Sequence, residues 1–269
     1  LSANNFGNFK HGIISGAKFN DVNGNGTRDA GESGIPSWKI YIAGNRNDSM
    51  LTNGDGNYEF IDLMKGSYTL REEMKNGWVQ SAPANPGTYT VNVFSGTNES
   101  NMSFGNYQLG TISGFVFNDL NDNKTRDLGE PGLQQWRIRL SVSSLDSTLS
   151  DNNGFYQFQN LNLGTYEVRE VTPSTWTQTS PVAGFYLVKI NSGTNASNKN
   201  FGNITKGIIS GVAFEDINGN AIKDPNEPTL SGWKINLSGA KTDSAITNAS
   251  GAYEFNELEI GNYAVSEIV

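Results

Sequence analysis

The strongest constraint on how this chain folds is an internal repeat. Ile14-Ser15-Gly16 recurs as Ile112-Ser113-Gly114 and Ile209-Ser210-Gly211, so a period of about 97 residues runs through the chain. The same period relates three tryptophans and three aromatic pairs: Trp38, Trp136 and Trp233; Tyr58 and Phe60, Tyr156 and Phe158, Tyr253 and Phe255. About 97 residues is the size of one small domain, so the sequence predicts a tandem array.

A closing motif marks the boundaries between the units. Phe104-Gly105-Asn106 returns as Phe201-Gly202-Asn203, and an earlier copy stands at Phe6-Gly7-Asn8. We therefore assign residues 1–9 to the tail strand of a preceding repeat, 10–107 to repeat 1, 108–204 to repeat 2, and 205–269 to repeat 3, which is incomplete at its C-terminal end. This division suggests a segment of a longer array.

Each unit shows the period-two alternation of half-buried strands. Trp38, Ile40 and Ile42 share one face, and Trp136–Leu140 and Trp233–Leu237 repeat the pattern. Turn dipeptides separate such runs, and no stretch of ten residues has a helical period. About seven short strands per repeat predict an all-β, Ig-like or prealbumin-like Greek-key sandwich with antiparallel strands. The linkers are short, so we expect a stiff rod of such domains.

Composition excludes several classes of function. The chain has no cysteine, one histidine and a net charge of −8. A disulfide scaffold and a thiolate metal site are therefore ruled out, and a phosphate-backbone partner is disfavoured. No apolar run reaches the ~20 residues of a membrane span. No paired acid and base remain outside the loops described next, so we expect no enzyme.

A loop of twelve residues follows the first predicted strand of each repeat and gathers oxygen-bearing side chains. Gly26 stands at position 6 of the first copy, where an EF-hand-type calcium loop turns sharply. Positions 1, 3, 5, 7, 9 and 12 supply the candidate ligands, with a backbone carbonyl at position 7. In repeat 1 these are Asp21, Asn23, Asn25, Thr27, Asp29 and Glu32; in repeat 2, Asp119, Asn121, Asn123, Thr125, Asp127 and Glu130; in repeat 3, Asp216, Asn218, Asn220, Ile222, Asp224 and Glu227.

This spacing predicts one Ca²⁺ per repeat, because Ca²⁺ takes six to eight hard oxygens that a curled loop can supply. Amides at two positions predict modest affinity, with Kd about 10⁻⁴–10⁻³ M. Lys124 and Ala221 replace Gly26 at position 6, where a positive φ would be strained. Two alternatives stay open: Asx turns that bind no ion, and Mg²⁺, which demands tighter octahedral geometry.

The flanks of the loop are strands, which excludes a helix–loop–helix EF-hand. Strand 13–20 enters the loop and strand 38–42 follows it, so the loop caps a sandwich. In a rod, the far end of the first strand lies near the next junction. We therefore hypothesise that bound Ca²⁺ stiffens the joints between repeats.

These motifs resemble those of a known family, the B repeats of serine-aspartate-repeat (SdrD-type) surface adhesins of bacteria, also found in archaeal surface proteins. The resemblance rests on Gly-x-x-Phe-x-Asp-x-Asn-x-Asn, on Gly56-x-Tyr58-x-Phe60 and on Gly66-x-Tyr68-x-Leu70-x-Glu72. It implies a prealbumin-like (CnaB-type) sandwich, calcium in each loop and a surface stalk. Related CnaB modules carry a Lys–Asn isopeptide bond instead. Lys18 occupies the matching first-strand position, but Val116 and Ala213 replace it in the other repeats, which argues against such a cross-link throughout the array.

Two further sets of residues have ordinary structural interpretations. Glu72, Glu170 and Glu267 keep the parity of core-facing residues, and we expect them at the rim, bonded to loop amides. The alternative for these glutamates is a second metal site or a remnant of isopeptide chemistry. The turn with Asp48, Asn53 and Asp55 is expected to be a hairpin turn rather than a second calcium site.

The leading functional hypothesis is a structural calcium-binding stalk or fibre-forming region of a secreted or cell-surface protein. The expected partners are neighbouring repeats of the same or an adjacent chain. One alternative is an extracellular filament assembled head-to-tail by strand complementation. The other is an adhesin module that binds an extracellular protein or glycan directly.

Overall fold

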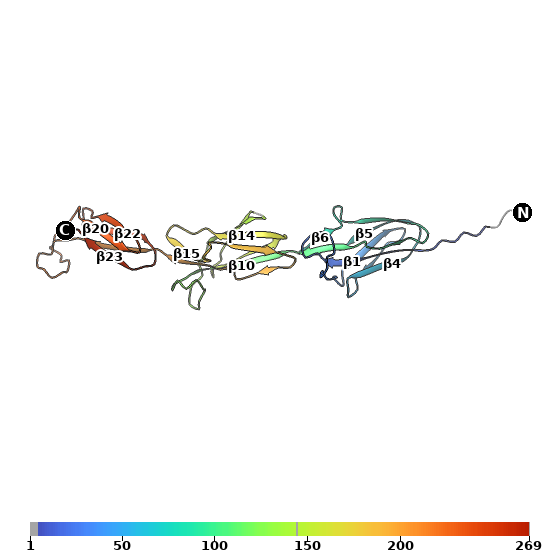
Figure 1. Ribbon diagram of the computed structural model, residues 1–269, viewed down its shortest axis with the longest axis horizontal. Helices are drawn as coiled ribbons and strands as arrows, with labels where there is room; N and C mark the ends of the chain where they lie inside the picture. Colours follow the sequence, from blue (N-terminus) through green and yellow to red (C-terminus); the bar gives the residue numbers. More distant parts are fainter. Residues whose placement is uncertain (1–4, 144, 269) are drawn as a thin grey trace.

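The computed structural model describes residues 5–143 and 145–268, and the chain forms an elongated rod (Figure 1). Three β-sandwich units follow one another along its long axis, in sequence order. The described residues form strands and no helix, which confirms the all-β, tandem architecture.

Repeat 1 consists of two sheets facing each other. Its strands are β1 (Gly12–Asn20), β2 (Lys39–Gly44), β3 (Asp48–Leu51), β4 (Asn57–Leu63), β5 (Gly66–Glu72), β6 (Trp78–Ala82), β7 (Tyr89–Val93), β8 (Asn98–Glu99) and β9 (Phe104–Gln108). One sheet has the order β4-β1-β9-β6, with β8 also paired to β1, and the other has the order β3-β2-β5-β7. Nine strands form where about seven were expected, and the shortest is β8 with two residues.

Repeat 2 reproduces this arrangement, and repeat 3 contains its first five strands. The strands of repeat 2 are β10 (Gly110–Asn118), β11 (Arg137–Val142), β12 (Asp146–Leu149), β13 (Phe155–Leu161), β14 (Gly164–Glu170), β15 (Trp176–Ser180), β16 (Tyr186–Ile190), β17 (Asn195–Ala196) and β18 (Phe201–Thr205). Those of repeat 3 are β19 (Gly207–Val212), β20 (Lys234–Gly239), β21 (Asp243–Ile246), β22 (Ala252–Leu258) and β23 (Tyr263–Glu267).

One sheet of each complete repeat is mixed rather than purely antiparallel, which corrects the expectation from the sequence. The last strand β9 pairs parallel to β1, with Lys18 opposite Phe104 and Asn20 opposite Asn106. Strands β10 and β18 pair in the same way. Alternation along one strand does not reveal the direction of its neighbour. The parallel exit strand carries the chain to the end of the repeat opposite its entry, so successive repeats extend in one direction.

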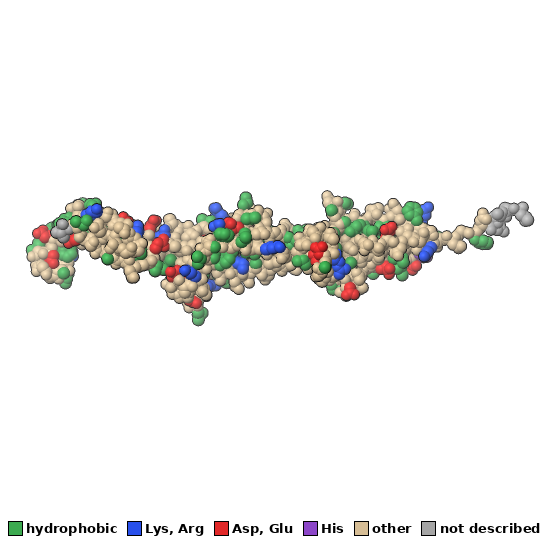
Figure 2. Space-filling view, viewed as in Figure 1, with side chains coloured by type: hydrophobic (Ala, Val, Ile, Leu, Met, Phe, Trp, Pro, Cys, Tyr) green, Lys and Arg blue, Asp and Glu red, His purple; other side chains and the backbone are tan. Residues whose placement is uncertain are grey.

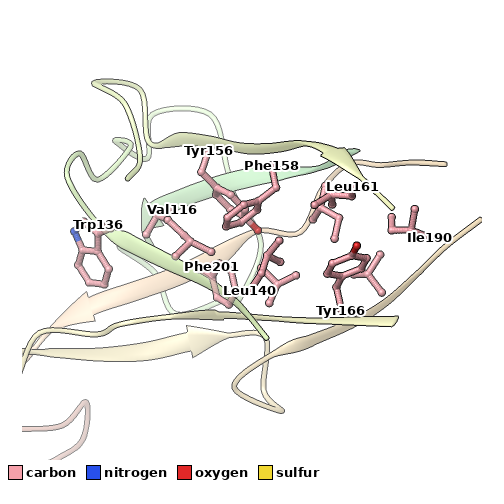
Figure 3. Packing of buried hydrophobic residues seen from close by; sticks show 13 residues of the cluster. Val116, Trp136, Leu140, Tyr156, Phe158, Leu161, Tyr166, Ile190 and Phe201 are labelled. Carbon is pink, nitrogen blue, oxygen red and sulfur yellow. The ribbon is translucent and has the colours of Figure 1, made fainter. Parts of the chain in front are cut away.

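The core of each sandwich follows the predicted alternation. Trp38, Ile40 and Ile42 are 2%, 0% and 2% exposed. In repeat 2, Tyr156, Phe158 and Tyr166 point into the space between the sheets (Figure 3). Side chains of two sheets packed in this way stabilise the fold mainly by removing apolar surface from water.

Residues 5–11 precede β1, and Phe9 packs against the core of repeat 1. Of the predicted tail strand 1–9, residues 1–4 lie outside the described part, and residues 5–9 form no strand in this structure.

No helix in the described ranges is long and apolar enough to cross a membrane. On the face shown in Figure 2, Lys and Arg side chains are scattered among acidic ones and form no continuous basic patch.

Candidate metal loops and buried polar clusters

The carboxylate at loop position 1 anchors the turn from within. Asp21 is fully buried, and it accepts hydrogen bonds from the backbone N–H groups of Asn25 (3.1 Å) and Gly26 (2.7 Å). Asp119 is equally buried and makes the corresponding contacts, as does the exposed Asp216 of repeat 3. The three loops therefore share one backbone conformation.

The side chains at positions 3, 5 and 9 converge on one point. In repeat 1, the amide nitrogens of Asn23 and Asn25 lie 2.8 and 2.7 Å from the same carboxylate oxygen, Oδ2 of Asp29. The equivalent distances are 3.0 and 2.5 Å in repeat 2, and 2.7 and 3.1 Å in repeat 3. The amide oxygens accept backbone N–H groups as Asx turns.

The glutamate at position 12 closes the loop. Glu32 accepts hydrogen bonds from the backbone N–H groups of Val22 (2.7 Å) and Asp29 (3.0 Å). Glu130 and Glu227 bind the equivalent groups and are 8% and 7% exposed. Backbone pairing also pins the loop ends, because Asn20 donates to the carbonyl of Ser33 and Ile35 to that of Lys18.

Position 6 has the left-handed backbone that the sequence predicts. Gly26, Lys124 and Ala221 have φ values of 75°, 69° and 60°. Position 4 is also left-handed, with Gly24 in repeat 1 and Asp122 in repeat 2. Non-glycine residues in this region are strained, so the second and third loops hold a conformation that their sequences disfavour.

These loops fit a cation in part. Positions 3, 5 and 9 converge on one point, but the two amides turn N–H groups toward it, and the carboxylates at positions 1 and 12 are bonded to backbone N–H groups. No group of three or more His, Cys, Asp or Glu side chains in the described residues forms a metal site by itself. A cation would therefore require both amides to turn their oxygens inward. The Asx-turn alternative describes the observed hydrogen bonds, and calcium stays a prediction.

The loop of repeat 1 lies at the joint with repeat 2. The hydroxyl of Ser192 donates to Asn20 Oδ1 (2.6 Å) and accepts the backbone N–H of Gln108 (2.8 Å). The Ser192 backbone N–H also binds the carbonyl of Val22, at loop position 2 (3.2 Å). One serine on the β16–β17 turn thus connects repeat 2 both to the loop and to the linker.

A second turn of repeat 2 packs against the same loop. Leu163, between β13 and β14, contacts Gly24 so closely that a Cβ on Gly24 would lie 2.7 Å from the leucine Cδ1. Beside it, the Tyr107 hydroxyl lies 3.1 Å from Asn162 Oδ1. At the next joint, Glu259 of repeat 3 accepts the Thr177 hydroxyl (2.9 and 2.7 Å) and lies 3.9 Å from Lys206 Nζ.

Repeat 1 also contains a buried polar cluster. Lys18 on β1 forms an ion pair with Glu72 on β5 (2.9 Å between Nζ and Oε2), and the two side chains are 0% and 1% exposed. Asn106 on β9 lies beside Glu72 and is fully buried. Among the described residues, neither amide atom of Asn106 has a partner at hydrogen-bond geometry, although Asn106 lies close enough to Glu72 to lower its pKa. An unpaired buried amide is costly, so this arrangement needs an explanation.

Burial shifts both charged groups of this cluster toward their neutral forms. Desolvation lowers the pKa of Lys18 to about 8, although Glu72 opposes the shift. Desolvation likewise raises the pKa of Glu72, although Lys18 and Asn106 oppose it. A buried neutral amine next to a carboxyl group is a nucleophile beside a group that can relay a proton.

Repeat 2 has the acid and the amide of this cluster without the amine. Val116 occupies the position of Lys18, and Asn203 Nδ2 donates to Glu170 Oε2 (2.9 Å). Glu170 Oε1 and Asn203 Oδ1 are buried without partners. Burial raises the pKa of Glu170 to about 8.

The rim position expected for these glutamates is wrong for Glu72. The parity argument placed its side chain on the core face correctly, but the sequence analysis did not pair it with Lys18 or Asn106. The only signal was the shared parity of Lys18 and Glu72 with core residues. The turn at Asp48 brings no metal ligands together: Asp48 binds Arg46, and Asn53 caps the backbone of Asp55 and Asn57.

Comparison with known proteins identifies the family. The family model for the SdrD B-like domain matches residues 14–109, 107–206 and 207–268. Serine-aspartate repeat-containing protein F of Staphylococcus epidermidis is 27% identical over 91% of this chain and 17% of its own length. Serine-aspartate repeat-containing protein D of Staphylococcus aureus is 27% identical over 91% of this chain and 21% of its own length. The chain thus spans about a fifth of these relatives.

Solved structures show more distant likenesses. The Bacillus anthracis TIE protein aligns over 97% of this chain and 46% of its own, with 15% identity and a TM-score of 0.42. The major pilin subunit BcpA of Bacillus cereus aligns over 96% and 88%, with 11% identity and a TM-score of 0.40. Family membership supports the expected location outside the cell or at its surface. The three family matches cover the repeats found in the sequence, and this chain belongs to the SdrD B-like domain family.

Proposed function

We propose that these repeats form a calcium-stiffened stalk in an extracellular or cell-surface protein. One observation carries the proposal: the loop that gathers the candidate ligands of repeat 1 is also the surface on which repeat 2 rests. Val22 and Gly24, at loop positions 2 and 4, contact Ser192 and Leu163. A Ca²⁺ ion held by the same loop would fix its shape and thereby the joint.

Calcium should stabilise the protein if it binds only the folded loops. At about 10 mM Ca²⁺ and a Kd of about 10⁻⁴ M, each site would contribute about 2.7 kcal/mol. We expect calorimetry to show a lower Tm in excess chelator, restored by Ca²⁺ and poorly by Mg²⁺. Small-angle scattering should show a broader distribution of lengths without Ca²⁺.

Matched variants make this experiment specific. Asp29→Asn removes the carboxylate on which the first loop converges and should reduce the Ca²⁺-dependent rise in Tm. Asp62→Asn changes an exposed carboxylate outside the loops and should leave that rise intact. An unchanged Tm on chelation, in a sample shown to be free of metal, would leave Asx turns as the whole explanation of the loops.

The buried cluster of repeat 1 supports a second stiffening device, an isopeptide bond between Lys18 and Asn106. The neutral Lys18 amine would attack Asn106 Cγ, forming the Nζ–Cγ bond and breaking the Cγ–Nδ2 bond. Glu72 would take a proton from Nζ and deliver it to Nδ2, and ammonia would leave. The product removes the unpaired amide nitrogen from the core and ties β1 to β9, the entry and exit strands of the repeat.

The bond would be visible in the mass of the intact protein. We expect the wild-type chain to weigh less than its sequence by one ammonia, and a digest to contain a branched peptide with Lys18 and Asn106. Lys18→Ala and Glu72→Gln should both restore the sequence mass. Glu170→Gln should leave the loss unchanged, because repeat 2 has no lysine at the matching position. A folded wild-type protein with the full sequence mass would refute the bond.

A further inference from the structure

Repeat 2 lacks the amine that lies beside the buried glutamate of repeat 1. Glu72 and Glu170 occupy equivalent positions at the ends of β5 and β14, opposite Ile40 and Ile138 in their sheets. Lys18 balances the charge of Glu72. Val116 offers Glu170 no charge, and no ion pair in the described part of the chain includes Glu170.

Among the described residues, no cation beside Glu170 compensates its charge. Asn203 on β18 donates one hydrogen bond, Thr172 contacts the carboxyl group from the same chain segment, and Tyr156 on β13 and Tyr186 on β16 face it. The neighbouring Arg169 is engaged by Glu167 at the surface. Burying an unpaired carboxylate costs several kcal/mol in general, and a buried group escapes this cost by taking up a proton.

We infer that repeat 2 folds around a neutral, protonated Glu170 that replaces the lysine of repeat 1, which makes repeat 2 the alkali-sensitive unit of the rod. Among the described residues Glu170 Oε1 has no hydrogen-bond partner, so it is the oxygen that the proton would occupy, while Oε2 accepts the hydrogen bond from Asn203. This inference is independent of calcium and of the isopeptide bond.

The sign of the pH dependence follows from the direction of the pKa shift. Glu170 has a pKa near 8 in the folded state, against an ordinary value of 4.5. Between these values the folded state holds a proton that the unfolded state has released, so stability falls as pH rises. The stabilisation of the folded state by the Glu170 proton is complete below about pH 4.5 and is lost above about pH 8.

Unfolding of the full chain across pH tests the inference. We expect the Tm of the repeat 2 transition to fall in the wild type, relative to Glu170→Gln, as pH rises from 5 to 8. The exposed Glu59→Gln serves as the matched control and should follow the wild type. Parallel pH profiles of wild type and Glu170→Gln would overturn the inference.

A measurement on the wild type keeps the test independent of whether the variant folds. In protein labelled with ¹³C at glutamate carboxyl groups, the resonance of Glu170 should titrate near pH 8. Glu170→Gln should remove that resonance and Glu59→Gln should retain it. If every resonance outside repeat 1 titrates near the ordinary value, Glu170 is charged in the folded protein and the inference fails.

Discussion

At the residue scale, the three loops share one backbone conformation but differ in the backbone strain at position 6. Each loop has a left-handed residue at position 6, but only Gly26 adopts that backbone without a Cβ penalty. Lys124 and Ala221 are held there by hydrogen bonds from their N–H groups to Asp119 and Asp216. The aspartate at position 1 therefore fixes a conformation that the residue at position 6 need not favour.

Relieving this strain should stabilise repeat 2. We expect Lys124→Gly to raise the free energy of unfolding of that repeat by about 1 kcal/mol, because glycine has no Cβ to crowd the left-handed backbone. Lys124 is exposed and forms no ion pair within the described residues, so little else is lost. Chemical denaturation gives the measurement. Gly26→Ala is the converse variant and should destabilise repeat 1; a stabilising Gly26→Ala would contradict the strain argument.

At the scale of elements, the loops of repeats 1 and 2 are each closed by a glycine that contacts another backbone segment. In repeat 2, Gly132 follows the loop and crosses the turn before β13, where a Cβ would lie 2.0 Å from the carbonyl oxygen of Asn153. Gly34 crosses the equivalent turn in repeat 1, where a Cβ would lie 1.8 Å from the carbonyl oxygen of Asp55. Bridges from Phe19 to Gly34 and from Phe117 to Gly132 hold these crossings against the first strands.

Adding one methyl group at this crossing should separate the elements. Gly132→Ala is expected to destabilise repeat 2 by about 1–3 kcal/mol, since the clash is with backbone that cannot turn aside. Gly54→Ala is the matched control, because a Cβ there meets nothing within 4 Å. Thermal unfolding of both variants is the measurement. Equal Tm values would show that the crossing yields at little cost.

At the scale of the whole molecule, the direction of the last strand makes the repeats a rod. Because β9 runs parallel to β1, the chain leaves each sandwich at the end that carries the loop, and β10 begins after a single linker residue, Leu109. The next repeat therefore meets the loop directly. Tandem units joined in this way couple mainly to their neighbours.

Weakening the first joint should change the shape of the rod more than the stability of its units. We expect Leu163→Ala combined with Ser192→Ala to broaden the distance distribution between spin labels on repeats 1 and 2. The Tm values of the repeats should change little, because both side chains lie at the joint and outside the core clusters. Leu187→Ala, at an exposed leucine on β16, is the control. An unchanged distribution in the joint variant would show that the linker alone sets the geometry.

The sequence by itself determined the number of repeats, the faces of the strands and the position of the loops. These properties are local: alternation along Trp38, Ile40 and Ile42 reports burial, and the spacing from Asp21 to Glu32 reports a curled loop, each within a dozen residues. Family membership then confirmed the architecture. The ion itself stays a prediction, since the same residues also form Asx turns.

The tertiary structure decided which distant residues meet. Lys18, Glu72 and Asn106 lie on the first, fifth and ninth strands of repeat 1, and only the parallel register of β1 and β9, with β5 packed from the facing sheet, brings them together. Pairing direction and sheet-to-sheet packing depend on contacts between segments far apart in the chain. Periodicity within one strand carries no information about such contacts.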